Sequence, residues 1–290
     1  MGERGNMVIA FLDLLGFSDL MKINIQAAYN NLDRLNRTIK ENMLDNISHP
    51  VENYNDKLRE FAIKNSVTSF KNLISISDSL IIGAEDIDIF IDQISTFLAS
   101  LFRMTIEDIK SKEDVLDKFP IMFRGGITVG NDVNFSPEMY IKDGKIKTGI
   151  NVCGLSYVKA VKLESTTKGP RLFVDNEFIK NLNDEKKRLI KEVDKTSGIS
   201  EIIWTYYLFE AGERSDDKLF NLQSCLYNKV LPHVRYIYDY YSTKECKEHY
   251  IELIKLLYKG AIMYAGEEKE CSLFVKKQFK VYEEVIKDKL

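Results

Sequence analysis

The order in which strand-like and helix-like segments follow one another constrains this fold more than any other feature of the sequence. A short apolar run rich in strand formers, residues 7–13, precedes a tight turn at Gly16 and a long stretch with apolar residues at helical spacing. Ser18 suits the N-cap of that long helix. The chain therefore opens as a strand, a tight turn and a helix.

A hairpin with an acidic turn follows. Residues 70–82 contain two strand-like runs separated by Ser77-Asp78-Ser79. An amphipathic helix at 87–109 and a strand at 119–130 complete the order β-α-β-β-α-β, which is that of the ferredoxin-like unit. The sequence therefore predicts an α/β protein of the α+β type with this unit as its core.

The rest of the chain extends that unit and then changes character. Residues 131–150 are rich in Gly, Asn and Asp and are expected to form a loop or an extra hairpin. A helix at 154–165 and a strand at 171–174 extend the same α/β layer. A strand-like run at 202–209 opens a tyrosine-rich region that is mostly helical in pattern to its end. We therefore expect a sheet followed by a helical extension.

The composition argues against several classes of protein. The four cysteines are scattered without CxxC spacing and no signal peptide is seen, which favours reduced thiols in a cytoplasmic protein. No apolar run approaches the roughly 18 residues of a membrane span. A net charge of −3 gives no broad basic face, so we expect no nucleic-acid partner. Any polyanion bound here should be small and held together with metal.

Two aspartates fall where such a sheet would bring them together. Asp13 ends the first strand, and Asp78 lies at the tip of the hairpin that neighbours this strand in a ferredoxin-like sheet. Each alone is more often a structural residue, but a carboxylate that ends a wholly apolar strand is costly to bury without a partner. Paired carboxylates bind Mg²⁺ or Mn²⁺, which share oxygen ligands with substrate phosphates. The helix N-terminus after residues 14–18 has free amides suited to phosphate.

Four segments in the correct order carry a resemblance to a known family. They are Phe11-Leu12-Asp13-Leu14-Leu15-Gly16-Phe17-Ser18, Ser75-Ile76-Ser77-Asp78-Ser79, Phe123-Arg124-Gly125-Gly126-Ile127-Thr128-Val129-Gly130 and the helical segment 154–164. They resemble the two metal-binding segments, a central strand and a late helix of class III adenylate and guanylate cyclases. The resemblance spans about residues 7–175. It implies a cyclase catalytic domain at 1–180 and a mostly helical C-terminal extension at 181–290 packed on it.

The resemblance also implies a mechanism and a set of site residues. Asp13 and Asp78 would be catalytic and would hold two Mn²⁺ or Mg²⁺ ions, with the Leu14 carbonyl as a further metal ligand. Lys162 would stabilise charge in the transition state from the other protomer of a homodimer whose sites lie at the interface. The implied nucleotide-binding residues are Leu15, Gly16, Phe17, Ser18 and Arg124.

Departures from the family pattern bear on the substrate. Val158 and Lys162 stand where purine cyclases have Asn and Arg, Ile74 stands where they present a lysine to adenine, and Ser77 replaces the usual Gly. The chain is accordingly most similar to the pyrimidine cyclases of the Pycsar antiphage system. These make cyclic UMP or cyclic CMP from UTP or CTP, for a separate effector protein. The alternatives are a purine cyclase or a non-catalytic cyclase-like module that binds a nucleotide.

Overall fold

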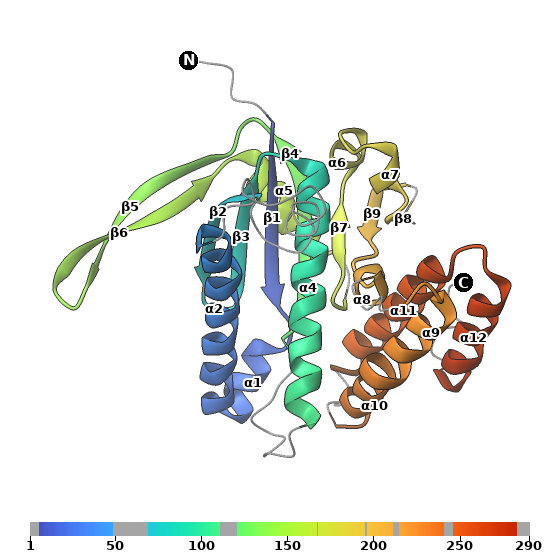
Figure 1. The fold of residues 1–290 in the computed structure, drawn as a ribbon. Coiled ribbons are helices and arrows are strands. Elements are labelled where there is room, and N and C mark those ends of the chain that lie inside the picture. The colour runs from blue at the N-terminus through green and yellow to red at the C-terminus, as the bar shows by residue number, and fades with distance from the viewer. Residues whose placement is uncertain are drawn as a thin grey trace.

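The structure, a computed structural model, describes residues 6–48, 69–110, 121–166, 168–194, 196–210, 215–240 and 246–282. Its strands form a seven-stranded sheet in the order β2-β3-β1-β4-β7-β9-β8 and a separate two-stranded arm, β5-β6 (Figure 1). The strands are β1 (Met7–Leu14), β2 (Phe70–Ile76), β3 (Ser79–Ala84), β4 (Phe123–Gly130), β5 (Asn134–Lys142), β6 (Lys145–Cys153), β7 (Leu172–Val174), β8 (Ile190–Asp194) and β9 (Ile199–Ile202).

Some helices alternate with the strands of this sheet along the chain, and a second group follows the last strand. Those of the first two thirds are α1 (Phe17–Ile23), α2 (Ile25–Ser48), α4 (Ile87–Lys110), α5 (Leu155–Glu164), α6 (Asn176–Lys180) and α7 (Asp184–Lys187). The C-terminal group contains α8 (Tyr206–Glu210), α9 (Lys218–Cys225), α10 (Leu231–Tyr240), α11 (Cys246–Ala265) and α12 (Lys269–Phe279). A π-helical turn, Leu226–Val230, joins α9 to α10, and a 3-10 turn, Lys280–Tyr282, follows α12.

The ferredoxin-like unit predicted from the sequence is confirmed by the strand pairing. β1 lies in the middle and pairs antiparallel with both β3 and β4, and β3 pairs antiparallel with β2. With α1-α2 after β1 and α4 after β3, this is the β-α-β-β-α-β order of an α+β protein. β7 then joins β4 in parallel, and β9 and β8 extend that edge.

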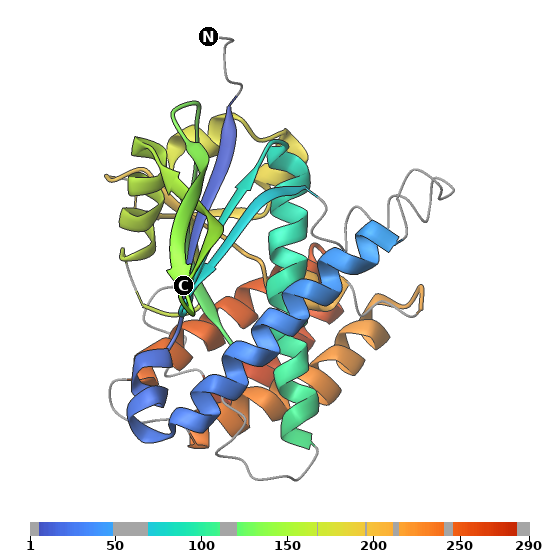
Figure 2. The same ribbon diagram turned by 90° about the vertical axis from the view of Figure 1, so that its left-hand side faces the viewer.

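The two faces of the sheet are covered by different helices. α2 and α4 lie on one face and α5 on the other (Figures 1 and 2). Because strand side chains alternate, Leu12 of β1 packs into the large core beneath α2 and α4. Ile9, Ile74 and Ile81 form a second, smaller core that includes Ala160 of α5. Asp13 is four residues after Ile9 on the same strand. Its side chain therefore lies on the same face of the sheet as Ile9, the face that α5 covers.

The predicted long first helix is interrupted, and its expected cap is wrong. Gly16, not Ser18, is the N-cap of α1, because the chain turns there with a φ of 73°, which glycine adopts freely. Asn24 then stops α1 in an extended conformation, with a φ of −153°. Its side-chain oxygen accepts a hydrogen bond from the Ala27 amide at 3.1 Å and so caps α2. The apolar spacing continues across this break, which hid it from sequence reasoning.

The strand-like run expected at 202–209 is only partly a strand. β9 ends at Ile202, and α8 begins at Tyr206. Nearly every residue of this run is buried. The run therefore lacks the spacing of polar residues that distinguishes a strand from a short helix in a sequence. The sheet thus continues past residue 180 before the helices begin, and the domain boundary expected there stays a prediction.

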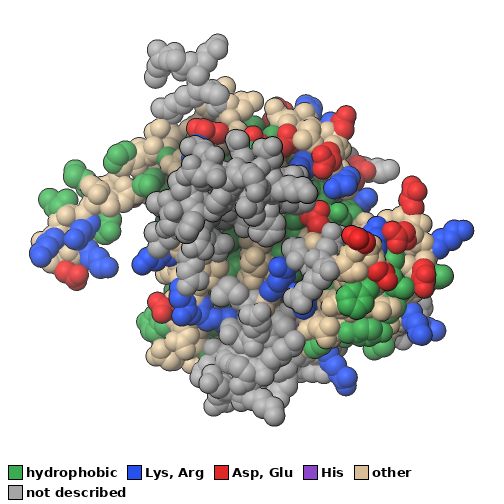
Figure 3. All heavy atoms as spheres, viewed as in Figure 1, with side chains coloured by type: hydrophobic (Ala, Val, Ile, Leu, Met, Phe, Trp, Pro, Cys, Tyr) green, Lys and Arg blue, Asp and Glu red, His purple; other side chains and the backbone are tan. Residues whose placement is uncertain are grey.

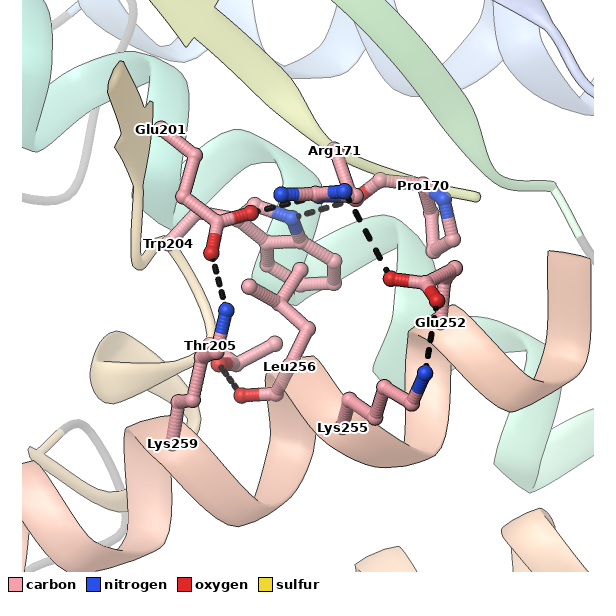
Figure 4. Close-up of polar contacts among 9 residues, drawn as sticks. All are labelled: Pro170, Arg171, Glu201, Trp204, Thr205, Glu252, Lys255, Leu256 and Lys259. Atoms are coloured by element: carbon pink, nitrogen blue, oxygen red, sulfur yellow. Dashed lines mark hydrogen bonds and ion pairs between the residues drawn. The ribbon is translucent and has the colours of Figure 1, made fainter. Parts of the chain in front are cut away.

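Helix α11 is joined to the sheet by a buried ionic network (Figure 4). Arg171, just before β7, pairs through Nε with the Glu201 carboxylate at 2.5 Å and through Nη1 with Glu252 at 3.5 Å. Lys259 of α11 also pairs with Glu201, whose side chain is 1% exposed. Trp204 donates its indole N–H to the Pro170 carbonyl at 2.8 Å. The sheet and the C-terminal helices therefore share one polar contact region.

The β5-β6 arm projects from the body (Figure 1), and its strand register gives it two unlike faces. In an antiparallel pair, directly opposed residues share a face. The pairs 135–152, 137–150, 139–148 and 141–146 place Phe135, Pro137, Met139, Ile141, Ile146, Ile150 and Val152 together with one threonine. We call this set the apolar arm face. Met139, Ile141 and Ile146 are each more than 70% exposed, so the outer part of this face has no cover within the described residues.

A buried histidine between α4 and α10 makes the fold sensitive to acid. His233 packs on the Phe102 ring with 4.5 Å between ring centroids, and neither ring nitrogen has a hydrogen-bond partner among the described residues. Burial lowers its pKa from 6.5 to about 3. The folded protein therefore holds this ring neutral over a pH range in which the unfolded chain protonates it.

Replacing this histidine is expected to protect the fold from acid. The unfolded chain binds the proton below pH 6.5, so stability falls as the pH drops from there towards about 3. By pH 4.5 the loss is about 2–3 kcal/mol, which His233→Leu should abolish. Urea unfolding of both proteins at pH 7.5 and 4.5 measures it. An identical pH dependence in the two proteins would contradict this assignment.

Candidate active site

The structure brings Asp13 and Asp78 together at one end of the sheet. Asp13 lies near the end of β1 and pairs in register with Ser79, the residue after Asp78. The Leu14 amide donates a hydrogen bond to the Asp78 carbonyl at 2.8 Å. Asp78 also contributes to raising the pKa of Asp13, as expected of a neighbouring like charge. The adjacency predicted from the sequence is therefore present.

Arg124 links Asp13 to a third carboxylate. It lies opposite Asp13 in the β1-β4 register, with its Nη2 atom 3.3 Å from Asp13 Oδ2. Its Nε atom forms an ion pair with Glu164 Oε1 at the end of α5. We call these residues the Asp13–Arg124–Glu164 cluster. Sequence reasoning did not assign a role to Glu164, although it ends the last of the four resembling segments.

Burial and charge act against each other in this cluster. Burial is the largest influence on Asp13 and raises its pKa, while the Arg124 guanidinium opposes that rise. The same holds for Glu164, where burial raises the pKa, Arg124 opposes the rise and the Asp13 charge adds to it. A further positive charge beside Asp13 would therefore be favourable, because two carboxylates here share one arginine.

A close approach of α5 to β4 makes this cluster possible. Gly126 of β4 faces α5, and a Cβ atom there would lie 2.0 Å from the Ala160 carbonyl and 2.6 Å from the Glu164 amide. Both neighbours are backbone atoms of α5. Only glycine lets the helix pack near enough for Glu164 to reach Arg124.

Gly126→Ala is expected to lower the free energy of unfolding by about 1–3 kcal/mol, because α5 must move away from the sheet. It should also weaken the Arg124–Glu164 ion pair. The matched control is Gly149→Ala, where the added Cβ would meet only the Tyr140 ring, at 3.3 Å. Thermal unfolding of both variants measures the difference. Equal stability of the two would show that α5 does not need this close approach.

The expected phosphate-binding turn has mixed exposure. Leu15 and Phe17 point into the main core, with 5% and 3% of their surfaces exposed, so they can offer a ligand only backbone groups. Ser18 is exposed in the first turn of α1. Gly16 makes the turn that starts this helix directly after β1. Nucleotide binding by these four residues and by Arg124 stays a prediction.

The hairpin turn that carries Asp78 is strained at one residue. Ser77 has a φ of 53°, in the left-handed region that glycine adopts without cost. This explains in physical terms why a glycine suits the position before this aspartate.

Lys162 lies away from the Asp13 of its own chain. It is exposed on α5, two residues before the buried Glu164, and such positions are about 200° apart around a helix. Leu155 and Val158 are exposed on the same face as Lys162, at 81% and 46%. We call these three residues the α5 stripe. Its side chains face solvent.

Ile74, where a purine cyclase would present a lysine, packs in the second core with Ile9 and Ile81. It is 9% exposed. An aliphatic side chain in this position has no hydrogen-bonding group to offer a base.

The described residues contain no group of three or more His, Cys, Asp and Glu side chains placed to hold a metal. Two adjacent carboxylates nevertheless fit Mg²⁺ or Mn²⁺, since such ions are commonly held by one or two carboxylates and by substrate phosphates. A Leu14 carbonyl ligand stays a prediction. None of the described helices is both long and apolar enough to cross a bilayer.

Known proteins resemble this chain in structure but not detectably in sequence. No family model and no curated protein matches it. The guanylate cyclase domain of RhGC from Catenaria anguillulae in complex with GTP is 13% identical, with a TM-score of 0.42, over 69% of this chain and 96% of that one. The adenylyl cyclase CyaB from P. aeruginosa is 12% identical, with a TM-score of 0.40, over 68% and 93%. Both are purine nucleotide cyclases. At these values the likeness carries no information about the activity or substrate of this chain.

Proposed function

We propose that this protein is a nucleotidyl cyclase that converts a pyrimidine nucleoside triphosphate, UTP ahead of CTP, into its 3′,5′-cyclic monophosphate and pyrophosphate. The observation that carries the proposal is the adjacency of Asp13 and Asp78 at the end of β1. Two acids at one strand end, next to a helix start, suit a metal-bound triphosphate. A module that only bound a base or a protein would have no use for both.

The residues of the chain have distinct roles in this reaction. Asp13 and Asp78 would hold two Mg²⁺ or Mn²⁺ ions, which when bound acidify the ribose 3′-hydroxyl and neutralise the triphosphate. Arg124 forms ion pairs with both Asp13 and Glu164. Glu164 would retain Arg124 when Asp13 turns to the metal. The amides at the start of α1 would hold phosphate oxygens.

The reaction as proposed needs a homodimer. Lys162 would stabilise the charge of the transition state, and it points away from its own Asp13, so the site it serves is that of a partner. The apolar arm face offers a surface for that partner, since Phe135 and Val152 at its base pack against the second core, on the α5 side. The arm and the α5 stripe thus lie on the same side of the molecule.

The pyrimidine preference rests on Ile74. Without a hydrogen-bonding side chain there, polar atoms on the edge of a bound purine would lack partners. This would weaken the binding of a purine nucleotide by a few kcal/mol. We expect UTP or CTP to be cyclised well ahead of ATP and GTP. Equal concentrations of all four, with Mn²⁺ and chromatographic separation of the products, test this. A dominant cyclic AMP or cyclic GMP peak would leave a purine cyclase as the function.

A non-catalytic nucleotide-binding module is the second candidate. The observation that favours it is the ion pair between Arg124 and Asp13, which engages one of the two proposed metal ligands. Release of pyrophosphate from any of the four triphosphates decides against it. From the resemblance to the Pycsar cyclases, we further propose a cytoplasmic enzyme whose cyclic product acts on a separate effector in defence against phage.

A further inference from the structure

A cavity with both polar and apolar lining lies at the end of the sheet opposite Asp13, where β1 begins. Its volume is about 500 Å³, which is within the usual range of small-molecule sites. Its polar lining consists of four asparagines and one acid, namely Asn6, Asn72, Asn131, Asn134 and Glu85. These residues come from the start of β1, from β2, from the segment after β3 and from the base of the arm.

The lining disfavours an anionic ligand and offers many hydrogen-bonding groups. Each asparagine amide presents donors and an acceptor in one plane, which suits the edge of a heterocycle or its sugar hydroxyls. No lysine or arginine is among the lining residues, and Glu85 places a carboxylate there. Its charge is partly offset by Lys71, whose Nζ lies 3.5 Å from Glu85 Oε2. A phosphate would therefore be disfavoured.

One wall of the cavity is apolar and fixed in position. The Phe135 ring lies over Gly83 of β3, where a Cβ atom would be only 2.6 Å from it. The Met7 sulfur lies beside the same glycine, at 3.3 Å from that Cβ position. Aromatic side chains beside planar amides are the groups that bind a base by stacking and by its edge.

We propose that this cavity binds an uncharged nucleobase or nucleoside, at a site separate from that of Asp13 and Asp78. The two sites lie at opposite ends of β1, since Met7 begins the strand and Asp13 is next to its end. Five residues of strand separate Met7 from Asp13, a span of about 20 Å. Binding here needs neither metal nor phosphate.

The cavity is connected to α5 through Asp132. This residue lies between two lining residues, Asn131 and Val133, and its carboxylate accepts hydrogen bonds from the Leu155 and Ser156 amides in the first turn of α5. These bonds lower the pKa of Asp132, the largest effect coming from the Ser156 side chain. A ligand held by Asn131 would therefore be linked through Asp132 to the helix whose far end carries Lys162 and Glu164. On the proposed function, it would change the rate of cyclisation.

The binding step is tested without the reaction. Metal-free protein is titrated calorimetrically with uridine, cytidine, adenosine and guanosine in turn, with no triphosphate present. We expect at least one to bind with a Kd below about 1 mM. Asn72→Ala removes one amide of the cavity and should weaken that binding by about 5–10-fold. The matched control is Asn151→Ala, which removes an exposed amide from the arm outside the cavity.

The outcomes separate this site from the substrate site. Asp13→Ala should bind the nucleoside as the wild type does, whereas loss of binding in that variant would place the nucleoside in the substrate site and overturn the proposal. Absence of binding by all four nucleosides also overturns it, as does a Kd that Asn72→Ala leaves unchanged in protein shown to be folded. None of these results depends on whether the protein cyclises a nucleotide.

Discussion

Asp13→Asn protein is expected to release pyrophosphate from UTP at least about 10³-fold more slowly than the wild type, and Asp78→Asn protein likewise. Each substitution keeps the size of the side chain and removes a negative charge that would help to hold the ions. Because both carboxylates would be needed to hold the two ions, neither alone should suffice. Pyrophosphate release with saturating Mn²⁺ and UTP is the measurement.

The same variants should remain folded. Burial and Asp78 raise the pKa of Asp13, so its ionised carboxylate costs stability at neutral pH, and Asp13→Asn should unfold at the same temperature or higher. Arg124 keeps Glu164 as its partner. The matched control is Asp184→Asn, which removes an exposed acid from α7 and should keep full activity. Near wild-type turnover by folded Asp13→Asn protein would sink the metal assignment.

The second large effect is expected at the arm. Ile141→Glu combined with Ile146→Glu places two charges on opposed residues of the apolar arm face, which a partner must bury. We expect the protein to become a monomer and its activity to fall at least about 10²-fold, because Lys162 no longer reaches a site. Analytical ultracentrifugation and pyrophosphate release measure the two effects on the same samples.

The control adds the same charge to the other face. Tyr140→Glu with Asn151→Glu alters two exposed residues on the polar face of the arm and should leave both mass and activity unchanged. An active monomer from the Ile141 and Ile146 variant would show that the site is complete in one chain. Equal effects of the two pairs would show that the apolar face has no special role.

Mixing inactive variants gives an independent test of a shared site. Asp13→Ala protein mixed equally with Lys162→Ala protein should form mixed dimers with one intact site each, and so recover about a quarter of wild-type activity. No recovery, under conditions where subunits exchange, would argue that Lys162 acts within one chain or not at all.

The core and the acid pair could be predicted because their signals are local. A wholly apolar strand that ends in Asp13, and a hairpin whose turn is Asp78, follow from the period of two in a strand and from turn composition. Once the β-α-β-β-α-β order is fixed, the sheet must place both acids at one end. The observed register of Asp13 with Ser79 agrees with this.

The missed features depend on contacts that no local pattern shows. Asn24 interrupts an apolar spacing that continues across it, and its capping bond to Ala27 is visible only in three dimensions. Glu164 becomes part of the site because Gly126 lets α5 approach. The composition of the stretch after β4 fits either a loop or a hairpin, and only the β5-β6 pairing reveals the alternation of its apolar residues.

The charges around Glu201 limit how this protein can be rearranged by evolution. Its buried carboxylate forms one ion pair with Arg171, beside the sheet, and another with Lys259, on α11 (Figure 4). Leaving a buried charge with too few partners costs several kcal/mol, a large share of the stability of a folded chain. A gene fusion that exchanged the C-terminal helices would therefore have to supply a cation at the position of Lys259. We expect the sheet and the C-terminal helices to be retained together in evolution.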